Sequence, residues 1–272
     1  MTLPRHRISR RFYLTFVAVS LTSVIAFAQA PKEAADKENE VLAILWQQSS
    51  GEHRALCYQA YALARMLLDR DLRNHQIRMR RAIIVDLDET VWDTSSYEAS
   101  NVKLKKGYPD GWNEWMTQAR ATALPGALEF LNYANSRGVR VFYVTNRKPV
   151  AKEATAQNLK TLGFPVVNDE TLLMRDDPAV ESKTARRKAI SAKYHVVLLM
   201  GDDLNDFDEV FEKSKTIASR IEATDRNRSQ FGTHFIVLPN PMYGNWANSL
   251  YEYNFKLTEQ QKAEKRRSLL KD

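Results

Sequence analysis

The sequence predicts an α/β protein whose core is a doubly wound parallel sheet with helices on both faces. Short apolar segments recur along the chain, and helix-like segments lie between them. Such alternation is typical of parallel sheets, because the chain returns over the faces of the sheet as helices. Three of the apolar segments run directly into polar residues, at the edge of the sheet where the ligand sites of this fold class gather.

The first 30 residues have the three-part composition of a cleavable signal peptide. A basic start with four arginines precedes an apolar run from Phe12 to Phe27, and small residues follow. The run is shorter than the roughly 20 residues that span a bilayer, so an uncleaved anchor is the second choice. We therefore expect export to the periplasm or cell envelope, by a general or a twin-arginine route. No stable membrane insertion is expected once the leader is removed.

The charge balance argues against a nucleic-acid polymer as partner. The formal net charge is +7, and the four leader arginines, which no acid accompanies, account for four of these charges and leave +3. A surplus of this size supports small anionic substrates only mildly and nucleic acid only weakly.

Residues 31–272 are expected to form one domain with two elaborations. Helical periodicity from Val41 to Leu72, interrupted at residues 49–51, predicts two N-terminal helices within about residues 31–80. Residues 91–122 are polar and aromatic without a clear period, and we expect a small helical, aromatic cap there. The single cysteine, Cys57, excludes an intramolecular disulfide and is expected to be a buried, inert thiol.

The core elements are predicted in chain order from apolar runs and helical periods. A helix over residues 125–136 is expected to carry Pro125 in its first turn. Four strands, one further short strand, two more helices and a basic surface helix complete the prediction: strands 81–85, 140–144, 196–200 and 235–238, short strand 172–174, helices 149–162 and 182–193, and the tail beyond residue 257.

Asp86 and Asp88 follow the first apolar strand, RAIIV. Two carboxylates two residues apart at a strand end can converge on one small site if a cation neutralises them. Alone, such a pair is more often a solvated corner between strand and loop. The apolar run directly before it makes a catalytic pair the more specific interpretation.

Three further residues are candidates for binding a phosphoryl group. Thr145 and Asn146 follow the strand RVFYV and offer a hydroxyl and a backbone amide. Lys183, near the start of a helix, could neutralise phosphate charge. Each has a plain alternative, because Thr-Asn after a strand is commonly a turn and the chain holds 40 lysines and arginines.

An acidic segment, GDDLND, follows the strand VVLLM. Its Asp202 and Asp206 supply hard oxygen ligands beyond a buried strand, as Mg²⁺ prefers. An acidic surface turn is the alternative. A glycine and several acids directly after a core strand favour the metal site.

In this order and context, the motifs resemble those of class C acid phosphatases in the haloacid-dehalogenase (HAD) superfamily. IVDLDETVWDTSSY, residues 84–97, and VLLMGDDLNDF, residues 197–207, follow that family's two signatures. Other segments, among them LPNPMYGNW, resemble the outer-membrane lipoproteins known as 5'-nucleotidases, so the resemblance extends from about Val41 to Tyr253. Three departures stand out. The lipoprotein cysteine is missing, Trp92 stands where leucine is usual, and Asp203 stands where asparagine or threonine is usual.

The resemblance implies a HAD-like fold and a magnesium-dependent phosphatase acting on small phosphomonoesters. Asp86 would be the nucleophile and Asp88 the general acid and base. Mg²⁺ would be held by Asp86, the Asp88 backbone carbonyl and Asp202, with support from Asp206. Thr145, Asn146 and Lys183 would bind the phosphoryl oxygens.

The resemblance also implies that Trp112 and Tyr243 contact an aromatic substrate such as a 5'-nucleotide. Packing of these rings in the core is the alternative, because Trp115 follows Trp112 at helical spacing.

The sequence leaves two other functions open. One is a non-catalytic envelope protein that binds a ligand such as haem or acts in adhesion on the same fold. The intact set of six polar side chains argues against it. The other is a phosphotransferase, which would pass phosphate to an acceptor alcohol instead of water. The sequence is compatible with a homo-oligomer.

Overall fold

The computed structural model describes residues 38–176 and 181–271. The chain divides into two units, Met1–Glu33 and Ala34–Asp272, and the fold below is that of the second. The expected signal peptide, residues 1–30, lies outside the described residues. Within the described part, no helix combines the length and apolar composition needed to cross a membrane.

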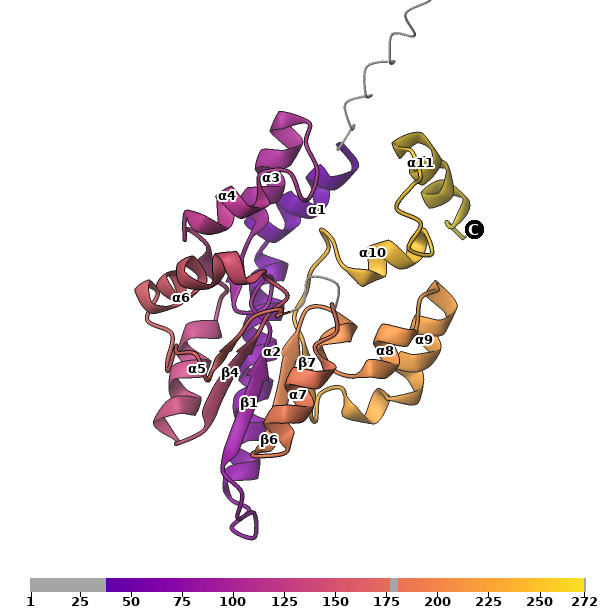
Figure 1. The fold of residues 1–272 in the computed structure, drawn as a ribbon. Helices are drawn as coiled ribbons and strands as arrows, with labels where there is room; N and C mark the ends of the chain where they lie inside the picture. The colour runs from indigo at the N-terminus through magenta and orange to yellow at the C-terminus, as the bar shows by residue number, and fades with distance from the viewer. Residues whose placement is uncertain (1–37, 177–180, 272) are drawn as a thin grey trace, which may run out of the picture. The chain divides into compact units, whose positions relative to one another are not determined.

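Five parallel strands form the central sheet in the order β5-β4-β1-β6-β7 (Figure 1). From β1 in the middle, the chain first adds β4 and β5 on one side and later β6 and β7 on the other. This reversal confirms the doubly wound prediction. In sheets of this topology, ligands bind beyond the carboxyl ends of the strands where the order reverses, here next to β1. The bounds are β1 Arg81–Val85, β4 Arg140–Val144, β5 Leu172–Leu173, β6 His195–Gly201 and β7 Phe235–Val237.

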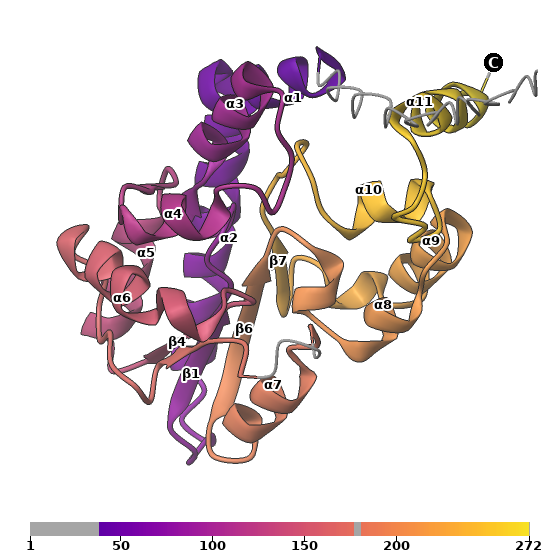
Figure 2. The ribbon, with the colours of Figure 1, turned by 45° about the horizontal axis from the view of Figure 1, so that its top comes forward.

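Alternate residues of the strands face two separate apolar clusters. In β1, Ile83 and Val85 pack on one face of the sheet, while Ala82 and Ile84 pack on the other. Figures 1 and 2 show α5 and α6 on one side of the sheet and α7, α8 and α9 on the other. Each large side chain buried this way contributes about 2 kcal/mol. The covering helices are α2 Gly51–Leu72, α5 Ala127–Ser136, α6 Lys152–Thr161, α7 Thr184–Ser191, α8 Glu209–Lys213 and α9 Ile217–Arg226.

The two predicted N-terminal helices are confirmed, with α1 Glu38–Ser49 ending directly before α2. Ser50 separates them, because its backbone is extended and its hydroxyl accepts a hydrogen bond from the His53 amide at 3.0 Å. Cys57 of α2 is fully buried, and burial raises the pKa of its thiol to about 11. The expected burial of this cysteine is thereby confirmed, and its raised pKa disfavours the reactive thiolate.

The cap between β1 and α5 contains short helices and a two-stranded ribbon, β2 Trp92–Asp93, α3 Ser95–Leu104, α4 Trp112–Thr117 and β3 Thr122–Ala123. The prediction that Pro125 lies in the first turn of the next helix was wrong. Gly126 takes a left-handed conformation, with φ +86°, and serves as the N-cap of α5, which therefore begins at Ala127.

The remaining elements are short and mostly polar. Helices α8 and α9, between β6 and β7, have no counterpart in the sequence prediction. The helix beyond residue 257 is confirmed as a surface helix with no buried residue. These elements are η1 Pro149–Ala151, η2 Leu204–Asp206, η3 Arg228–Gln230, α10 Asn245–Leu250 and α11 Glu259–Ser268.

Candidate active site

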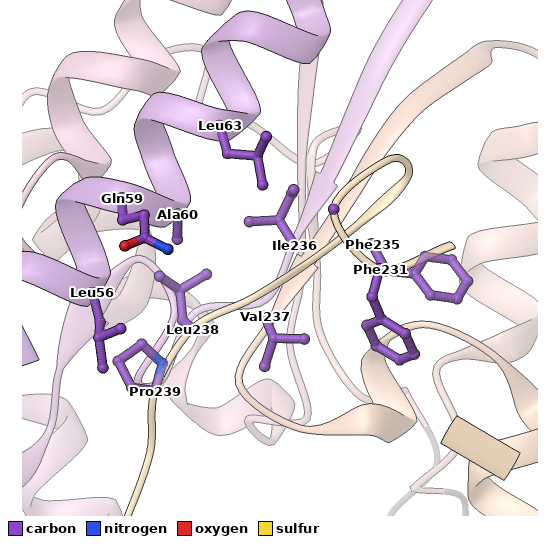
Figure 3. Close-up of a pocket in the computed structure, with 11 residues that line it drawn as sticks. Leu56, Gln59, Ala60, Leu63, Phe231, Phe235, Ile236, Val237, Leu238 and Pro239 are labelled. Atoms are coloured by element: carbon purple, nitrogen blue, oxygen red, sulfur yellow. The ribbon is translucent and has the colours of Figure 1, made fainter. Parts of the chain in front are cut away.

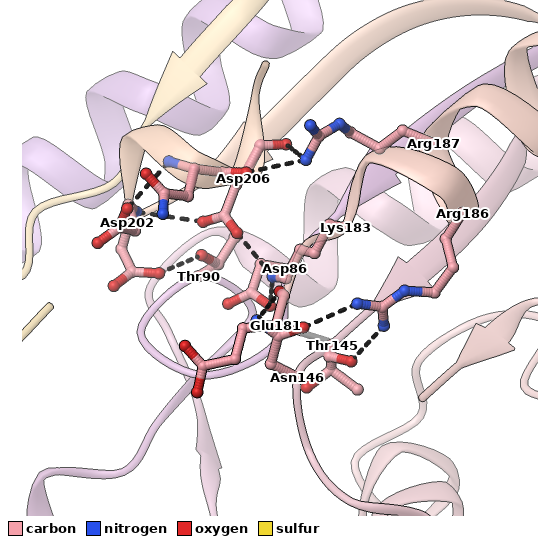
Figure 4. A network of polar contacts seen from close by, with 12 residues as sticks. Asp86, Thr90, Thr145, Asn146, Glu181, Lys183, Arg186, Arg187, Asp202 and Asp206 are labelled. Atoms are coloured by element: carbon pink, nitrogen blue, oxygen red, sulfur yellow. Dashed lines mark hydrogen bonds and ion pairs between the residues drawn. The ribbon is translucent and has the colours of Figure 1, made fainter. Parts of the chain in front are cut away.

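The polar residues that follow β1, β4 and β6 meet at the carboxyl edge of the sheet, as the sequence predicts. The Asp86 amide donates to the Met200 carbonyl of the neighbouring strand at 3.0 Å. Figure 4 shows Asp86, Thr145 and Asp202 in one network of polar contacts, with Lys183 beside Asp86 and Asp206. The parallel sheet therefore brings together side chains that are far apart in sequence.

Three carboxylates form a cluster that could hold a divalent cation. One carboxylate oxygen from each of Asp86, Asp202 and Asp206 lies within 4.8 Å of the others. The Lys183 ammonium donates to Asp206 at 2.6 Å and also to Asp86. Three carboxylates and one ammonium leave two negative charges uncompensated, which matches one divalent ion. Carboxylate oxygens are the ligands that such hard cations prefer.

The pKa values of all three carboxyl groups in the cluster are raised, as expected where buried carboxylates have too little positive charge nearby. Burial raises the pKa of Asp86 to about 7, with Asp206 and Asp88 adding to the rise and Lys183 opposing it. Burial and the neighbouring Asp206 raise the pKa of Asp202 well above its usual range. Burial lowers the pKa of Lys183, but Asp206 and Asp86 outweigh it and raise that pKa above its ordinary value. A bound cation would let all three carboxylates ionise.

Gly201, the last residue of β6, makes room for Asp206. A Cβ at Gly201 would lie 2.5 Å from the Asp206 Cβ, closer than real Cβ atoms come. The Asp206 carboxylate folds back to accept from the Asp203 amide at 3.1 Å, within a capping box around η2. Only glycine at 201 lets this turn place Asp206 in the cluster.

Asp202 is oriented by two neighbours that the sequence did not reveal. The Thr90 hydroxyl donates to one carboxylate oxygen at 3.2 Å, and the Asn240 amide donates to the other at 2.8 Å. Asn240 lies in the loop after β7, more than 30 residues beyond Asp202. A polar residue just past a predicted strand was the only available signal for it.

Helix α7, whose N-cap is Lys183, contacts both the loop after β4 and the loop after β6. Arg186 donates to the Thr145 carbonyl at 2.6 Å (Figure 4). Arg187, which is buried, donates to the carbonyls of Asn205 and Asp206 at 2.8 and 3.1 Å. Neither arginine was predicted as a site residue. Their i+3 and i+4 spacing from Lys183 is the signal that places all three on one helix face.

Thr145 and Asn146 differ in burial and in their hydrogen-bond partners. Thr145 is buried, and its hydroxyl oxygen accepts from the Arg147 amide at 3.1 Å, which leaves the hydroxyl proton to donate elsewhere. The exposed Asn146 side chain donates to the Glu181 carbonyl and accepts from Arg186, both at 2.7 Å. A contact from Asn146 to phosphate would therefore come from its backbone.

The Asp88 side chain is not part of the acidic cluster. It accepts hydrogen bonds from Arg147, with Nη2 at 2.6 Å, and from the Trp92 indole Nε1 at 2.9 Å. Trp92 is fully buried, so its ring packs in the core while its indole N–H binds Asp88. Any share of Asp88 in the metal site would come from its backbone carbonyl.

The two aromatic candidates lie in different surroundings. Trp112 stacks on Trp115, with ring centroids 5.4 Å apart and planes 8° from parallel, and its ring meets Tyr97 edge-on. The helical spacing of the tryptophans thus produces direct packing. The Tyr243 hydroxyl lies 3.4 Å from the Thr94 hydroxyl, so its loop contacts the segment after Asp88.

Asp203 ties the loop of β6 to α10 and does not join the acidic cluster. Its carboxylate accepts from the Asn245 amide at 2.6 Å and from the Asn205 amide at 2.9 Å. The Arg220 guanidinium lies 3.4 Å away. Burial is the main cause of the raised pKa of Asp206, and the Asp203 carboxylate adds to the rise as a neighbouring negative charge, while Lys183 opposes it.

A separate apolar groove of about 350 Å³ runs along α2 and β7 (Figure 3). It contains no titratable or nucleophilic side chain, so it offers no chemistry of its own. Its lining residues are Leu56, Gln59, Ala60, Leu63, Phe231, Gly232, Phe235, Ile236, Val237, Leu238 and Pro239.

Comparison with known proteins agrees with this geometry. The family model described as HAD superfamily, subfamily IIIB (acid phosphatase), matches residues 10–246. The chain belongs to this acid phosphatase family. The class C acid phosphatase from Bacillus anthracis is 40% identical in sequence, with a TM-score of 0.82, over 88% of this chain and 98% of that one. A second structure of that enzyme, with tungstate bound, is also 40% identical, with a TM-score of 0.82 over 89% and 99% of the two chains.

Membership of the HAD acid phosphatases makes the chain a phosphoric monoester hydrolase. It also accounts for the parallel sheet flanked by helices and for an acidic cluster suited to a divalent metal. The family resemblance drawn from the sequence motifs is confirmed.

Proposed function

We propose that the chain is an exported, magnesium-dependent acid phosphatase that hydrolyses phosphomonoesters through an aspartyl-phosphate on Asp86. The observation that carries the proposal is the cluster formed by Asp86, Asp202, Asp206 and Lys183, in which Asp202 is half-buried and the other three are buried. A carboxylate nucleophile needs positive charge nearby, from Lys183 and from a cation held by the carboxylates, because it must approach an anionic phosphate.

The reaction divides into two displacements, each with a role for Asp88. First, a carboxylate oxygen of Asp86 forms a bond to phosphorus while the bond from phosphorus to the leaving oxygen breaks. Protonated Asp88 gives its proton to that oxygen. Ionised Asp88 then takes a proton from water, whose oxygen attacks phosphorus and releases phosphate and Asp86.

Mg²⁺ would be held by the side chains of Asp86, Asp202 and Asp206 and by the Asp88 backbone carbonyl. Bound there, it supplies the positive charge that lets Asp86 stay ionised beside phosphate. Lys183, the Thr145 hydroxyl and the Asn146 backbone would bind the phosphoryl oxygens. Tungstate, a tetrahedral oxyanion like phosphate, is bound in the Bacillus anthracis relative, which supports an oxyanion pocket in this chain.

Substitution of the nucleophile tests the mechanism. Asp86→Asn should lower kcat for p-nitrophenyl phosphate by at least about a thousandfold, because the amide cannot form the intermediate. Asp169→Asn is the matched control, since Asp169 is a surface carboxylate with 93% of its side chain exposed. Undiminished turnover by well-folded Asp86→Asn would refute the nucleophile assignment.

We further propose that the substrate carries an aromatic group, as in 5'-nucleotides, which Tyr243 and Trp112 contact. The position of the Tyr243 loop beside the Asp88 segment supports this. Tyr243→Leu should raise KM for adenosine 5'-monophosphate about tenfold, the value of one lost stacking contact, and change KM for ribose 5-phosphate little. Equal changes for both substrates would remove Tyr243 from substrate selection.

Export is proposed from the leader-like first 30 residues. The mature protein recovered from the periplasm should lack them, which intact-mass measurement would show. Recovery of the full-length chain from the cytoplasm alone would contradict it.

A further inference from the structure

Arg147 is a buried arginine that contacts Asp88. The rings of Trp92, Trp112 and Trp115 surround its guanidinium, and we call these three rings the tryptophan box. Arg147 is only 3% exposed. Its guanidinium carbon lies 4.5 Å from the ring centroid of Trp92, 5.3 Å from that of Trp112 and 5.8 Å from that of Trp115. Tryptophan faces attract cations most strongly of the aromatic rings, and more so when water is excluded. The box therefore fixes the guanidinium in one place.

From this box, the guanidinium faces the carboxylate of Asp88. Nη2 donates to Oδ1 at 2.6 Å and Nε donates to Oδ2 at 3.0 Å, a two-pronged contact that sets the plane of the carboxylate. The Trp92 indole adds a third donor to Oδ1 at 2.9 Å. One side of Asp88 is thus fully engaged, while its side chain keeps 18% of its surface exposed.

We propose that Arg147 and Trp92 are positioning residues, which hold Asp88 in the orientation that delivers a proton to the leaving oxygen. This inference rests on the proposed role of Asp88 as general acid. Arg147 is not itself placed to bind phosphate, because only 2% of its side chain is exposed and its fork is occupied by Asp88. Trp112 and Trp115, on the cap helix α4, complete the box, so the cap contributes to the chemistry through Arg147.

The positioning of Asp88 should affect how strongly the rate depends on the basicity of the leaving group. A basic leaving group, such as a ribose or alkyl oxygen, needs the proton from Asp88 as its bond to phosphorus breaks. A weakly basic one, such as p-nitrophenolate, departs almost without it. Loss of a positioning residue should therefore harm alkyl phosphates far more than activated aryl phosphates. A defect in phosphate binding or folding would harm both equally.

The test measures kcat/KM, which reports the first displacement, for a series from p-nitrophenyl phosphate to phenyl phosphate and ribose 5-phosphate. Arg147→Met keeps an apolar stem in the box and removes the fork. We expect a fall of about a hundredfold on ribose 5-phosphate and only a few-fold on p-nitrophenyl phosphate. Trp92→Phe, which keeps a ring beneath Arg147 without the N–H, should give a smaller change of the same pattern. The exposed neighbour Lys148, as Lys148→Met, is the control and should match wild type.

The same series with Asp88→Asn decides whether Arg147 acts through Asp88. If it does, adding Arg147→Met to Asp88→Asn causes no further loss that depends on the leaving group. A further loss in the double variant that depends on the leaving group would overturn the inference. So would a loss in the Arg147→Met single variant that is equal for every leaving group. If Arg147→Met does not fold, an unchanged leaving-group dependence in Trp92→Phe would overturn it instead. Wild-type protein that hydrolyses none of these esters would overturn the proposed function, and this inference with it.

Discussion

Individual residues in the acidic cluster are constrained more by their neighbours than by their own type. Asp86 and Asp206 share one ammonium, that of Lys183, while Asp202 relies on two neutral donors. Burial and the neighbouring carboxylates raise the pKa of all three, and the single ammonium only partly opposes the rise at Asp86 and Asp206. The residue that permits this crowding is Gly201, which has no side chain at all.

Gly201→Ala should weaken the metal site without a large change in the fold. The added Cβ must displace the Asp206 side chain, because it would lie 2.5 Å from the Asp206 Cβ. We expect Mg²⁺ affinity, measured by calorimetry, to fall by about 10- to 100-fold. Gly51→Ala is the control, since nothing lies within 4 Å of a Cβ there, and it should bind like wild type. Equal affinity in both variants would contradict the close fit at Gly201.

At the scale of elements, helix α7 holds the loop after β4 and the loop after β6 in fixed positions through hydrogen bonds. Its N-terminal Lys183 enters the cluster, Arg186 binds the β4 loop and Arg187 binds the β6 loop. One helix face thus sets the spacing between the expected phosphate-binding groups and the metal ligands. A change in α7 should therefore affect the stability of both loops.

Arg187→Met should destabilise the protein by about 2–4 kcal/mol, because the half-buried carbonyl of Asn205 and the buried carbonyl of Asp206 lose their donor. Urea unfolding would measure the change. The next residue, Lys188, has 71% of its side chain exposed, and Lys188→Met should alter stability by less than about 0.5 kcal/mol. An equally small change in the free energy of unfolding for both variants would show that the hydrogen bonds from Arg187 do not stabilise the fold.

At the scale of the whole molecule, the uncompensated cluster links stability to pH and metal. In the metal-free protein the pKa of Asp86 is about 7, above the value of about 3.9 for an unfolded chain. Between these values the folded state binds more protons than the unfolded one, so stability falls as pH rises from about 4 to 7. A cation that replaces the protons would offset the loss.

Mg²⁺ should therefore raise the melting temperature more at pH 8 than at pH 5. Thermal unfolding with and without Mg²⁺ across this range would measure the difference. Asp86→Asn, which removes the titrating carboxylate, should show a smaller dependence on pH. A metal-induced shift that is the same at every pH would contradict the linkage.

The sequence by itself determined the order of the core strands along the chain and the acids at their ends. The runs RAIIV and RVFYV match β1 and β4, because a strand buried on both faces must be apolar throughout. Parallel strands with polar carboxyl ends then leave one edge where Asp86 and Asp202 can meet. The sequence was less informative where elements are short and polar, as in α8 and α9, and it placed Pro125 inside a helix that begins two residues later.

The tertiary structure alone decided what each polar group faces. Nothing in the order of residues shows that Arg147 turns its fork to Asp88, or that Asp203 faces α10 while Asp206 enters the cluster. These choices depend on contacts between segments far apart in sequence, whose side-chain directions are set only when the sheet, the cap and α7 pack together. Hydrogen bonds and ion pairs form only when their atoms lie within a few ångströms of one another. The amino-acid sequence does not give these distances between distant residues.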